Sequence, residues 1–590
     1  MMSALVRFAI RFYGVIIGLA LLVIVYGAYS LSQSDLNVFP EFAPTQVVIQ
    51  TESPGLSASL VEKLVTQPIE NVVSGAIGIK SLRSQSIPGL SIITVIFQDK
   101  SDIYRNRQIV GERLNMLGSQ LPPGIVPNIT PLTSSASTVM GIGVTSDKLS
   151  LMQLRTLVDW HLTPHLMAIP GVADINVYGG EVRQFQIKID PRKLMLYQLN
   201  VQDVVFAATR ATGVRGAGYI QNDNQRIILN SQGQTTTPQQ LANITLLRKL
   251  GRTIRIRDVA EVTEGAAPSI SAAAVNGKPA VYLSVQGQLG ANVYALTKQL
   301  ERKLADIKPS LEKQKVTLHE GLFRPANFIE TAIHSLRSDI LIGSVLVTLV
   351  LFIFLFNVRT AVISATAIPL SLLTAIVVLY QYGVGLNIMV LGGLAIALGE
   401  VVDDAIIDTE NIFRRLRENR LLAQPLPAAK VVFQASMEVR SSVVYATMIV
   451  ALVFLPLLTL SGVAGKLFAP LGYAYISAIL ASLVVALTLT PALCYALLAN
   501  APLKNEDSPL LRWLKKRYVR LLQQIENRYQ LILLTSFVCI ALGLAILPLF
   551  RGQFIPALRE GHYILHMTAV PGTSEVQTLK LGNQVTKVLL

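Results

Sequence analysis

Long apolar runs recur along this chain of 590 residues and constrain its fold more than any other feature. A helix needs about 20 mostly apolar residues to cross a membrane, because the hydrocarbon layer is about 30 Å thick. Runs close to or above that length lie at residues 12–31, 340–356, 361–380, 386–413, 443–460, within 473–498, and at 531–550. The pattern therefore predicts a polytopic α-helical membrane bundle with seven spans.

The run at 386–413 is expected to face the interior of that bundle. It contains five carboxylates: Glu400, Asp403, Asp404, Asp408 and Glu410. A charge near the middle of a bilayer costs roughly 2.5–3.5 kcal/mol on insertion scales, so acids placed there usually mark an ion or proton path. The small residues Gly392, Ala395 and Gly399 are expected to let another helix approach closely.

Two interpretations of these acids stay open. Asp403 and Asp404 are adjacent and central, which favours a proton path. The alternative is that the acids are merely neutralised by Arg or Lys from neighbouring helices, or lie beyond the membrane edge. Asp408 and Glu410, close to the arginines at 414 and 415, suit this alternative best.

Basic residues flank the apolar runs and account for the net charge of +15. They gather at Arg7 and Arg11, at Arg359, at 414–420 and at 512–520. Lys and Arg beside membrane spans follow the positive-inside rule, so the charge requires no nucleic-acid partner. In one orientation of the chain, every basic loop lies on the cytoplasmic side. This orientation places the N-terminus in the cytoplasm and residues 34–338 outside it.

A tandem repeat decides how the first run is interpreted. The segment Ala28-Tyr29-Ser30 resembles a signal-peptide cleavage site, which is the alternative to a first span. However, Val38-Phe39-Pro40 follows the first run as Phe554-Ile555-Pro556 follows the last, and each is followed by a Pro-Gly pair. The last run cannot be a signal peptide, so its counterpart is predicted to be a span. We also expect the chain to stop about forty residues into a second copy.

Residues 34–338 lack a long apolar run and predict an α+β domain outside the membrane. The order strand, helix, strand, strand, helix is that of a ferredoxin-like split βαβ unit. The first unit covers 34–133, and the second covers 134–183 together with 268–325. Between its halves, residues 184–267 form an insert with an extended hairpin at 214–226, and such a hairpin favours contact with another subunit.

The remaining segments complete the predicted organisation. The first span lies in 1–33, spans two to six lie in 338–500, and the seventh lies in 530–550. Residues 501–529 hold a basic amphipathic helix that is suited to the cytoplasmic membrane surface, where it contacts lipid. Residues 551–590 would begin a third ferredoxin-like unit.

Metal-ligating side chains are few. His562 and His566 lie four apart on a strand predicted after the last run, with Met567 adjacent, and such ligands suit a soft or borderline cation. The alternative is two surface histidines. His161 and His165 also lie four apart, but Pro164 disturbs the turn between them and favours a structural role.

The sequence lacks the motifs of disulfide frameworks, phosphate-binding loops and metalloproteases. Cys494 and Cys539 both lie in apolar runs, so there is no disulfide framework and no CxxC metal site. Residues 462–467 lack the spacing and the Ser or Thr of a phosphate-binding Walker motif. No HExxH motif is present, so enzymatic chemistry is not supported and no cofactor is expected.

One first span, a large outer domain, five further spans and a repeat of the whole resemble the resistance–nodulation–division (RND) exporters. The acidic run at 401–411 carries the most specific motif. Shorter segments resemble the heavy-metal branch: Val47-Val48-Ile49-Gln50-Thr51, Val95-Ile96-Phe97-Gln98-Asp99, Pro170-Gly171-Val172 and Gly216-Ala217-Gly218-Tyr219-Ile220. The resemblance covers the whole chain and roughly the first 55–60% of a family member.

The resemblance implies an inner-membrane homotrimer that works with a periplasmic adaptor and an outer-membrane channel. The proton relay would carry over to Asp403, Asp404 and Glu410. In copper and silver exporters, a Met ligand lies near the position of His566. One cation-exporting subgroup has an Asp where this chain has Ala397.

Glu400 and Asp408 are extra acids that the common pattern does not contain. The resemblance places the charged partners of the relay in second-half spans, which are absent here. We therefore expect this chain alone, without its C-terminal half, to be unable to run a transport cycle.

Three functions remain open on the sequence. The first is proton-driven export of heavy-metal cations through a tripartite complex. The second is export of drugs or other amphiphiles by the same machinery. The third is a non-transporting half that acts as a membrane scaffold and binds an adaptor or its missing half.

Overall fold

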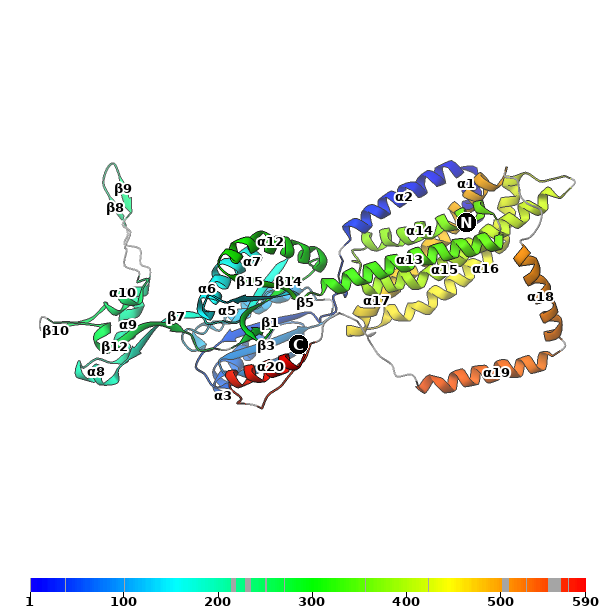
Figure 1. Cartoon of the computed structure of the whole chain (residues 1–590). Coiled ribbons are helices and arrows are strands. Elements are labelled where there is room, and N and C mark those ends of the chain that lie inside the picture. Colours follow the sequence, from blue (N-terminus) through cyan, green and yellow to red (C-terminus); the bar gives the residue numbers. More distant parts are fainter. Residues whose placement is uncertain are drawn as a thin grey trace. The chain divides into compact units, whose positions relative to one another are not determined.

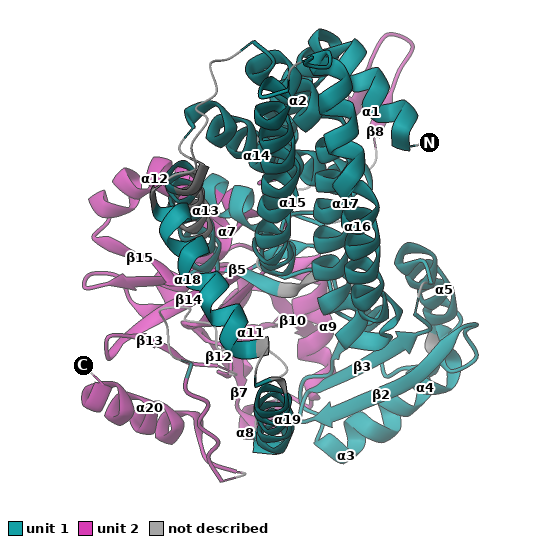
Figure 2. Ribbon diagram, turned by 90° about the vertical axis from the view of Figure 1, so that its right-hand side faces the viewer, with its two compact units in different colours: residues 1–139, 286–299, 324–564 teal, residues 140–285, 300–323, 565–590 magenta. Residues whose placement is uncertain are grey.

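The computed structural model describes residues 2–589 except 35, 38, 100, 214–218, 229–234, 250–251, 270, 356, 423, 501–508, 527, 550–563 and 571. It divides into two compact units, coloured separately in Figure 2. Unit 1 comprises Met1–Val139, Gln286–Gln299 and Arg324–Ile564, and unit 2 comprises Met140–Val285, Leu300–Phe323 and Leu565–Leu590. Figure 1 labels the elements in chain order.

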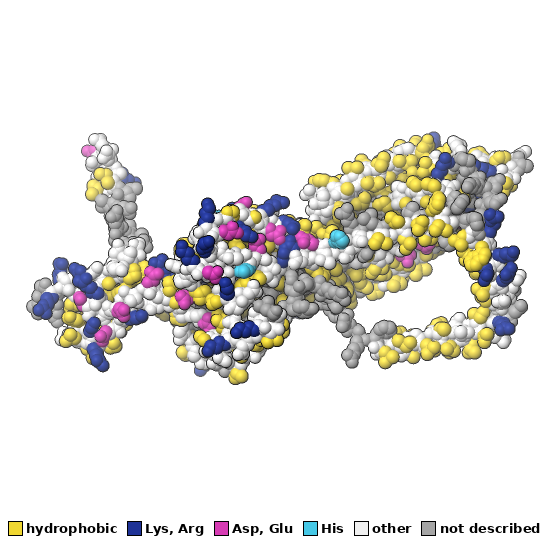
Figure 3. All heavy atoms as spheres, viewed as in Figure 1, with side chains coloured by type: hydrophobic (Ala, Val, Ile, Leu, Met, Phe, Trp, Pro, Cys, Tyr) yellow, Lys and Arg dark blue, Asp and Glu magenta, His cyan; other side chains and the backbone are white. Residues whose placement is uncertain are grey.

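Unit 1 contains a bundle of long helices. They are α1 (Met2–Arg11), α2 (Tyr13–Gln33), α13 (Ala326–Leu355), α14 (Val358–Gln381), α15 (Ile388–Arg420), α16 (Ala428–Thr459) and α17 (Gly462–Leu498). Two further helices, α18 (Pro509–Glu526) and α19 (Tyr529–Ile546), follow them. Hydrophobic side chains dominate the visible surface of the bundle (Figure 3), as expected where lipid is the solvent.

Five helices in the described part of the chain are long and apolar enough to cross a membrane: Tyr13–Gln33, Val358–Gln381, Ala428–Thr459, Gly462–Leu498 and Gln530–Leu549. The other two predicted runs also lie in helices, α13 and α15, of 30 and 33 residues. The Asn387 side chain begins α15 by accepting a hydrogen bond from the Val390 amide, which satisfies a free helix donor.

Three helices begin well before their predicted apolar runs. Helix α13 begins at Ala326, α16 at Ala428 and α17 at Gly462, whereas the runs begin at residues 340, 443 and 473. No glycine or proline stands between Ala428 and Val443, so nothing in the sequence stops α16 from extending toward its N-terminus. Arg440 consequently lies inside α16 and not in a loop before it.

The first sheet belongs to unit 1 and has the order β2-β3-β1-β4, with antiparallel pairing throughout. Its strands are β1 (Gln46–Glu52), β2 (Ile79–Ile87), β3 (Leu90–Phe97) and β4 (Asn128–Ile129). The helices between them are α3 (Ala58–Val61), a π-helical turn (Glu62–Thr66), α4 (Gln67–Val73) and α5 (Ile103–Asn115). Alternate residues of β3 are buried, as in a strand with one face on a core.

The second sheet has the order β13-β14-β5-β15, and β6 also pairs with β14. Its strands are β5 (Thr133–Ser146), β6 (Val172–Gly179), β13 (Ala273–Val275), β14 (Lys278–Gln288) and β15 (Val316–Phe323). Its helices are α6 (Leu151–Leu157), a π-helical turn (Val158–Leu162), α7 (Thr163–Met167) and α12 (Val293–Lys313). Near the C-terminus of the chain, α20 (Glu575–Leu589) contacts β13.

The insert within unit 2 has a small core of its own. Strands β7 (Arg183–Ile189) and β12 (Ala260–Ala266) pair at its base. Between them lie α8 (Pro191–Leu196), α9 (Val201–Thr212), α10 (Pro238–Ala242), β10 (Thr245–Lys249), β11 (Arg252–Arg255) and α11 (Ile256–Val259). Strands β8 (Tyr219–Gln221) and β9 (Arg226–Ile228) form a hairpin where one was predicted, although residues 214–218 lie outside the described residues.

Candidate functional site

Helix α15 packs against α14, α16 and α17 in the bundle of unit 1 (Figure 2). A Cβ atom at Gly393 would lie 2.5 Å from the Leu471 backbone oxygen, so glycine is required for this approach of α15 to α17. Gly392 and Gly399, which were predicted to make a close contact, have open space around them. The predicted face was off by one residue, which turns it by about 100° around the helix axis.

The five acids of α15 differ sharply in exposure. Asp408 is buried and Asp404 is partly buried, whereas Glu400, Asp403 and Glu410 are exposed on the bundle described here. Residues four apart share one face of a helix, so Asp404 and Asp408 point toward the same neighbours. The stripe formed by Asp403 and Glu410 points away from them.

Asp404 contacts a neutral hydroxyl group. The Ser482 hydroxyl on α17 donates a hydrogen bond to Asp404 Oδ2 over 3.1 Å. One turn further along both helices, α17 presents the backbone oxygen of Ala486 to the next layer of the site. Asp404 and Asp408 are four residues apart, and so are Ser482 and Ala486, so the two polar layers lie about one helical turn apart.

Asp408 forms a buried ion pair with Arg440 of α16. The Arg440 Nη2 atom lies 2.9 Å from Asp408 Oδ2, and the Arg440 and Asp408 side chains are only 1% and 2% exposed. The same nitrogen lies 2.7 Å from Ser436 Oγ and 3.0 Å from the Ala486 oxygen. Asp408 Oδ1 and Arg440 Nε have no hydrogen-bond partner among the described atoms, so the pair is held at one point and is not bidentate.

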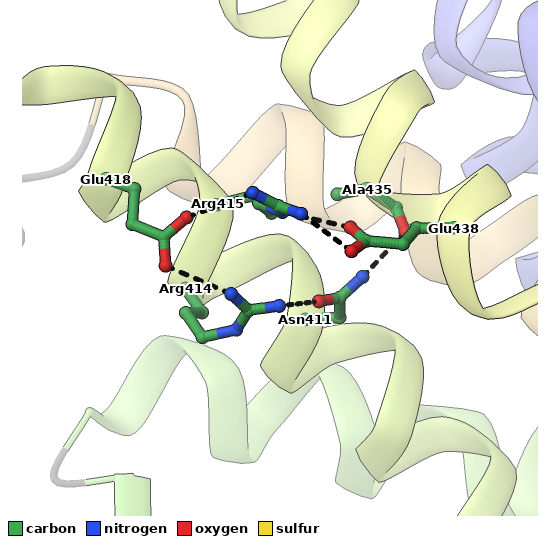
Figure 4. A network of polar contacts seen from close by, with 6 residues as sticks. All are labelled: Asn411, Arg414, Arg415, Glu418, Ala435 and Glu438. Carbon is green, nitrogen blue, oxygen red and sulfur yellow. Dashed lines mark hydrogen bonds and ion pairs between the residues drawn. The ribbon is translucent and has the colours of Figure 1, made fainter. Parts of the chain in front are cut away.

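Asp408 is therefore neutralised by an arginine of a neighbouring helix, as the alternative interpretation of the acids predicted, and this arginine is Arg440 rather than Arg414 or Arg415. Both arginines instead belong to a separate network near the end of α15 (Figure 4). Arg415 forms ion pairs with Glu438 over 2.6 Å and with Glu418 over 3.3 Å. Arg414 and Arg415 lie beyond the turn that carries Asp408, and their side chains reach toward the helix end and α16.

Asn411 connects this network to the helix interface. Its Nδ2 atom donates to the Ala435 oxygen of α16 over 2.8 Å, and its Oδ1 atom accepts from Arg414 Nη2 over 2.6 Å. Arg414 in turn lies 3.0 Å from Glu418 (Figure 4). Asn411 is buried, so these bonds satisfy an amide that would otherwise lose its water contacts.

Arg440 is the functional candidate that the sequence analysis missed. The apolar run begins at residue 443, which leaves Arg440 outside the predicted span. The unbroken helical sequence from Ala428 was the available signal, since it extends the helix past that boundary. Asp408 thus has a cation within this chain, whereas the resemblance placed the charged partners of the relay in second-half spans.

The proposed metal ligands are not gathered into a site in the described residues. His566 and Met567 are exposed, and residues 564–570 form no strand, so the strand predicted to carry them is wrong there; His562 lies outside the described residues. Groups of three or more His, Cys, Asp and Glu side chains that could hold a metal ion are absent from the part of the chain that the structure describes.

The second histidine pair, His161 and His165, makes a contact within its own helical segment. His161 and His165 are exposed in unit 2, with ring centroids 4.8 Å apart. His165 Nδ1 lies 2.6 Å from the His161 backbone oxygen, which engages one ring nitrogen in a local contact.

Comparison with known proteins places these features in a family. Residues 5–590 match the AcrB/AcrD/AcrF family. The HelA protein of Legionella pneumophila is 32% identical over 598 residues, covering 100% of this chain and 56% of that protein. The cobalt-zinc-cadmium resistance protein CzcA of Cupriavidus metallidurans is 31% identical, covering 95% of this chain and 54% of its own length.

The cation efflux system protein CusA of Escherichia coli is 29% identical, with 97% of this chain and 55% of that protein covered. A crystal structure of a heavy metal efflux pump matches with a TM-score of 0.72 and 26% identity, over 88% of this chain and 49% of that one. The chain thus spans about half the length of these relatives. Because the family match runs over nearly every residue, the chain belongs to the AcrB/AcrD/AcrF family, and its resemblance to the RND exporters is confirmed.

Proposed function

We propose that this protein is a proton-driven efflux transporter subunit that exports heavy-metal cations. Its similarity to a cobalt-zinc-cadmium resistance protein and to a cation efflux protein supports the class of cargo. The acids of α15, set among helices that can cross a membrane, support the proton coupling. Drug export has no comparable observation in its favour.

The proposed arrangement has seven spans, namely α2, α13 to α17 and α19, in the bacterial inner membrane. The N-terminus and α18 lie on the cytoplasmic side, and residues 34–338 lie in the periplasm, as the positions of the basic residues favour. The protein acts as a homotrimer with a periplasmic adaptor and an outer-membrane channel. The β8–β9 hairpin is the part of the insert that reaches a neighbouring subunit.

The observation that carries the proposal is the Asp408–Arg440 pair beside Asp404. We assign proton binding to Asp403, Asp404 and Glu410. Arg440 supplies a fixed positive charge that offsets one carboxylate, so the remaining acids change the net charge of the site when they bind or release a proton. A change of charge on α15 alters its attraction to α16, and this is how proton transfer would move the helices.

The cation itself is cargo, and its path lies in the outer domain. We propose His566 and Met567, with His562, as ligands on that path, because imidazole and thioether groups suit soft or borderline cations. A path needs ligands that release the ion again, so loosely gathered and exposed donors are compatible with this role.

The proposal is tested by cation export under an imposed pH gradient, from proteoliposomes that contain this chain together with the second half that its relatives possess. Asp403→Asn and Asp404→Asn should each abolish export that depends on the gradient, since an amide cannot carry the proton. Glu418→Gln is the matched control, because it removes an acid from the same helix at an exposed position. Export by Asp403→Asn and Asp404→Asn at the rate of the unmodified protein would refute the proposed relay.

A further inference from the structure

A cavity of about 590 Å³ lies in unit 1 where α1 meets the ends of α16 and α17. Its lining includes three basic side chains and three aromatic ones: Arg7, Arg11, Lys430, Tyr13, Phe433 and Tyr495. The described lining contains no Asp or Glu, so the three positive charges face the cavity without an opposing carboxylate. Nothing in the proposed proton relay uses this cavity.

Helix α1 packs with its apolar face on the bundle and carries its basic residues at the cavity. Its Val6 and Ile10 side chains are buried and belong to the core formed with α15, α16 and α17. Arg7 and Arg11 lie four residues apart on the exposed part of the helix, so both reach the same side of the cavity. The Arg7 guanidinium carbon lies 5.3 Å from the centre of the Phe433 ring, a cation–π distance that holds it against α16.

The aromatic side chains place the cavity at the level of a membrane surface. Tyr13 begins α2, and its ring packs edge-on against that of Tyr495 in the last turn of α17, with centroids 5.5 Å apart. Lys430 lies in the first turn of α16. Helices α2, α16 and α17 can each cross a membrane, and each has one end at this cavity. Tyrosines are enriched where membrane spans meet the lipid head groups.

The helix that begins at the cavity also carries an apolar surface. Val15, Leu19 and Leu22 are exposed within two to three turns of Tyr13, on the face of α2 turned away from it, as expected where lipid surrounds the helix. A molecule that enters the cavity from this lipid layer needs a negatively charged group for the three cations and long apolar chains that stay in the layer. A phospholipid with an anionic head group has this chemistry, and basic pockets beside membrane helices are suited to such lipids.

We propose that this cavity binds one anionic phospholipid, with its phosphate between Arg7, Arg11 and Lys430 and its acyl chains in the surrounding lipid layer. The bound lipid fastens the amphipathic helix α1 to α16. The proposal rests on the membrane placement of these helices and not on proton coupling or on the cation exported. A failure of the relay test would leave it standing, and the reverse also holds.

Native mass spectrometry of the purified protein in mild detergent tests the proposal. The probes are phosphatidylglycerol and phosphatidylcholine with identical acyl chains, and inorganic phosphate as a competitor. Each basic residue near an anionic lipid contributes about fivefold to affinity, so R7Q/R11Q/K430Q should weaken phosphatidylglycerol binding about a hundredfold. Phosphatidylcholine should bind weakly to both forms, and inorganic phosphate at millimolar concentration should not displace the lipid.

The matched control removes three exposed basic side chains elsewhere in unit 1, at Lys63, Arg83 and Arg105. The triple variant K63Q/R83Q/R105Q should bind phosphatidylglycerol like the unmodified protein. If the pocket triple variant does not fold, K430Q alone should still show a loss of about fivefold. The proposal would be overturned if the unmodified protein bound phosphatidylglycerol and phosphatidylcholine equally. It would also be overturned if the control variant lost as much affinity for phosphatidylglycerol as the pocket variant, or if inorganic phosphate displaced the lipid.

Discussion

Two sets of ion pairs join or border α15 and α16, and they differ chiefly in burial. In the first, Asp408 and Arg440 lie 2.9 Å apart and are almost fully enclosed. In the second, Arg415 and Glu438 approach even more closely, to 2.6 Å, but both side chains are 42% exposed. The shorter distance therefore does not identify the pair that matters more to the fold.

The difference follows from what each charge loses when its partner is removed. An exposed ion pair returns to water, so it contributes little to stability. A buried charge without its partner stays in a medium that cannot solvate it, which makes breaking the pair far more costly than its net contribution suggests. Asp408 and Arg440 therefore constrain how α15, α16 and α17 fit together, whereas the Arg415–Glu438 pair does not.

Replacing Arg440 should have the largest effect. Arg440→Gln leaves the Asp408 carboxylate buried without a cation, and breaking such a pair costs about 3–5 kcal/mol. We expect a corresponding loss in the free energy of unfolding, measured by reversible denaturation in mixed micelles, together with poor yield of folded protein.

The double variant D408N/R440Q separates the buried charge from lost packing. It removes both charges and should recover most of the stability that Arg440→Gln loses, because no unpaired charge remains. If the double variant is as unstable as the single one, the shape of the Arg440 side chain is what stabilises the bundle and the electrostatic account is wrong.

Replacing Ser436 should have an intermediate effect. Its hydroxyl lies 2.7 Å from Arg440 Nη2, and a hydrogen bond to a charged group contributes about 1.5–3 kcal/mol. Ser436→Ala should lower the unfolding free energy by about that amount in the same denaturation measurement.

Ser441→Ala provides the control for this change. Ser441 is exposed on the same helix, so losing its hydroxyl should leave stability nearly unchanged. Equal effects of the two serine variants would mean that Ser436 does not support the buried pair.

The contrast between these pairs also explains what could be predicted from sequence. Apolar length and period predicted that 386–413 is helical, because both depend only on neighbouring residues. The partner of Asp408 could not be found this way, since it depends on how two helices sit side by side. Gly393 illustrates the same limit: its role depends on the position of Leu471, some eighty residues away in the chain. The strand predicted around His566 relied on the tandem repeat of the segment after the first span, and the described residues there are irregular.

Replacing Arg415 should have the smallest effect, and salt should distinguish it from the buried pair. Arg415→Gln removes contacts with Glu438 and Glu418 that water already reaches, so the midpoint of thermal unfolding should shift only slightly at low salt. At about 1 M salt, charges are screened within roughly 3 Å, and that slight shift should vanish. The defect of Arg440→Gln should persist at the same salt, because ions do not enter a site whose side chains are 1–2% exposed. If both variants respond equally to salt, Arg440 is reached by solvent, and burial does not separate the two ion pairs.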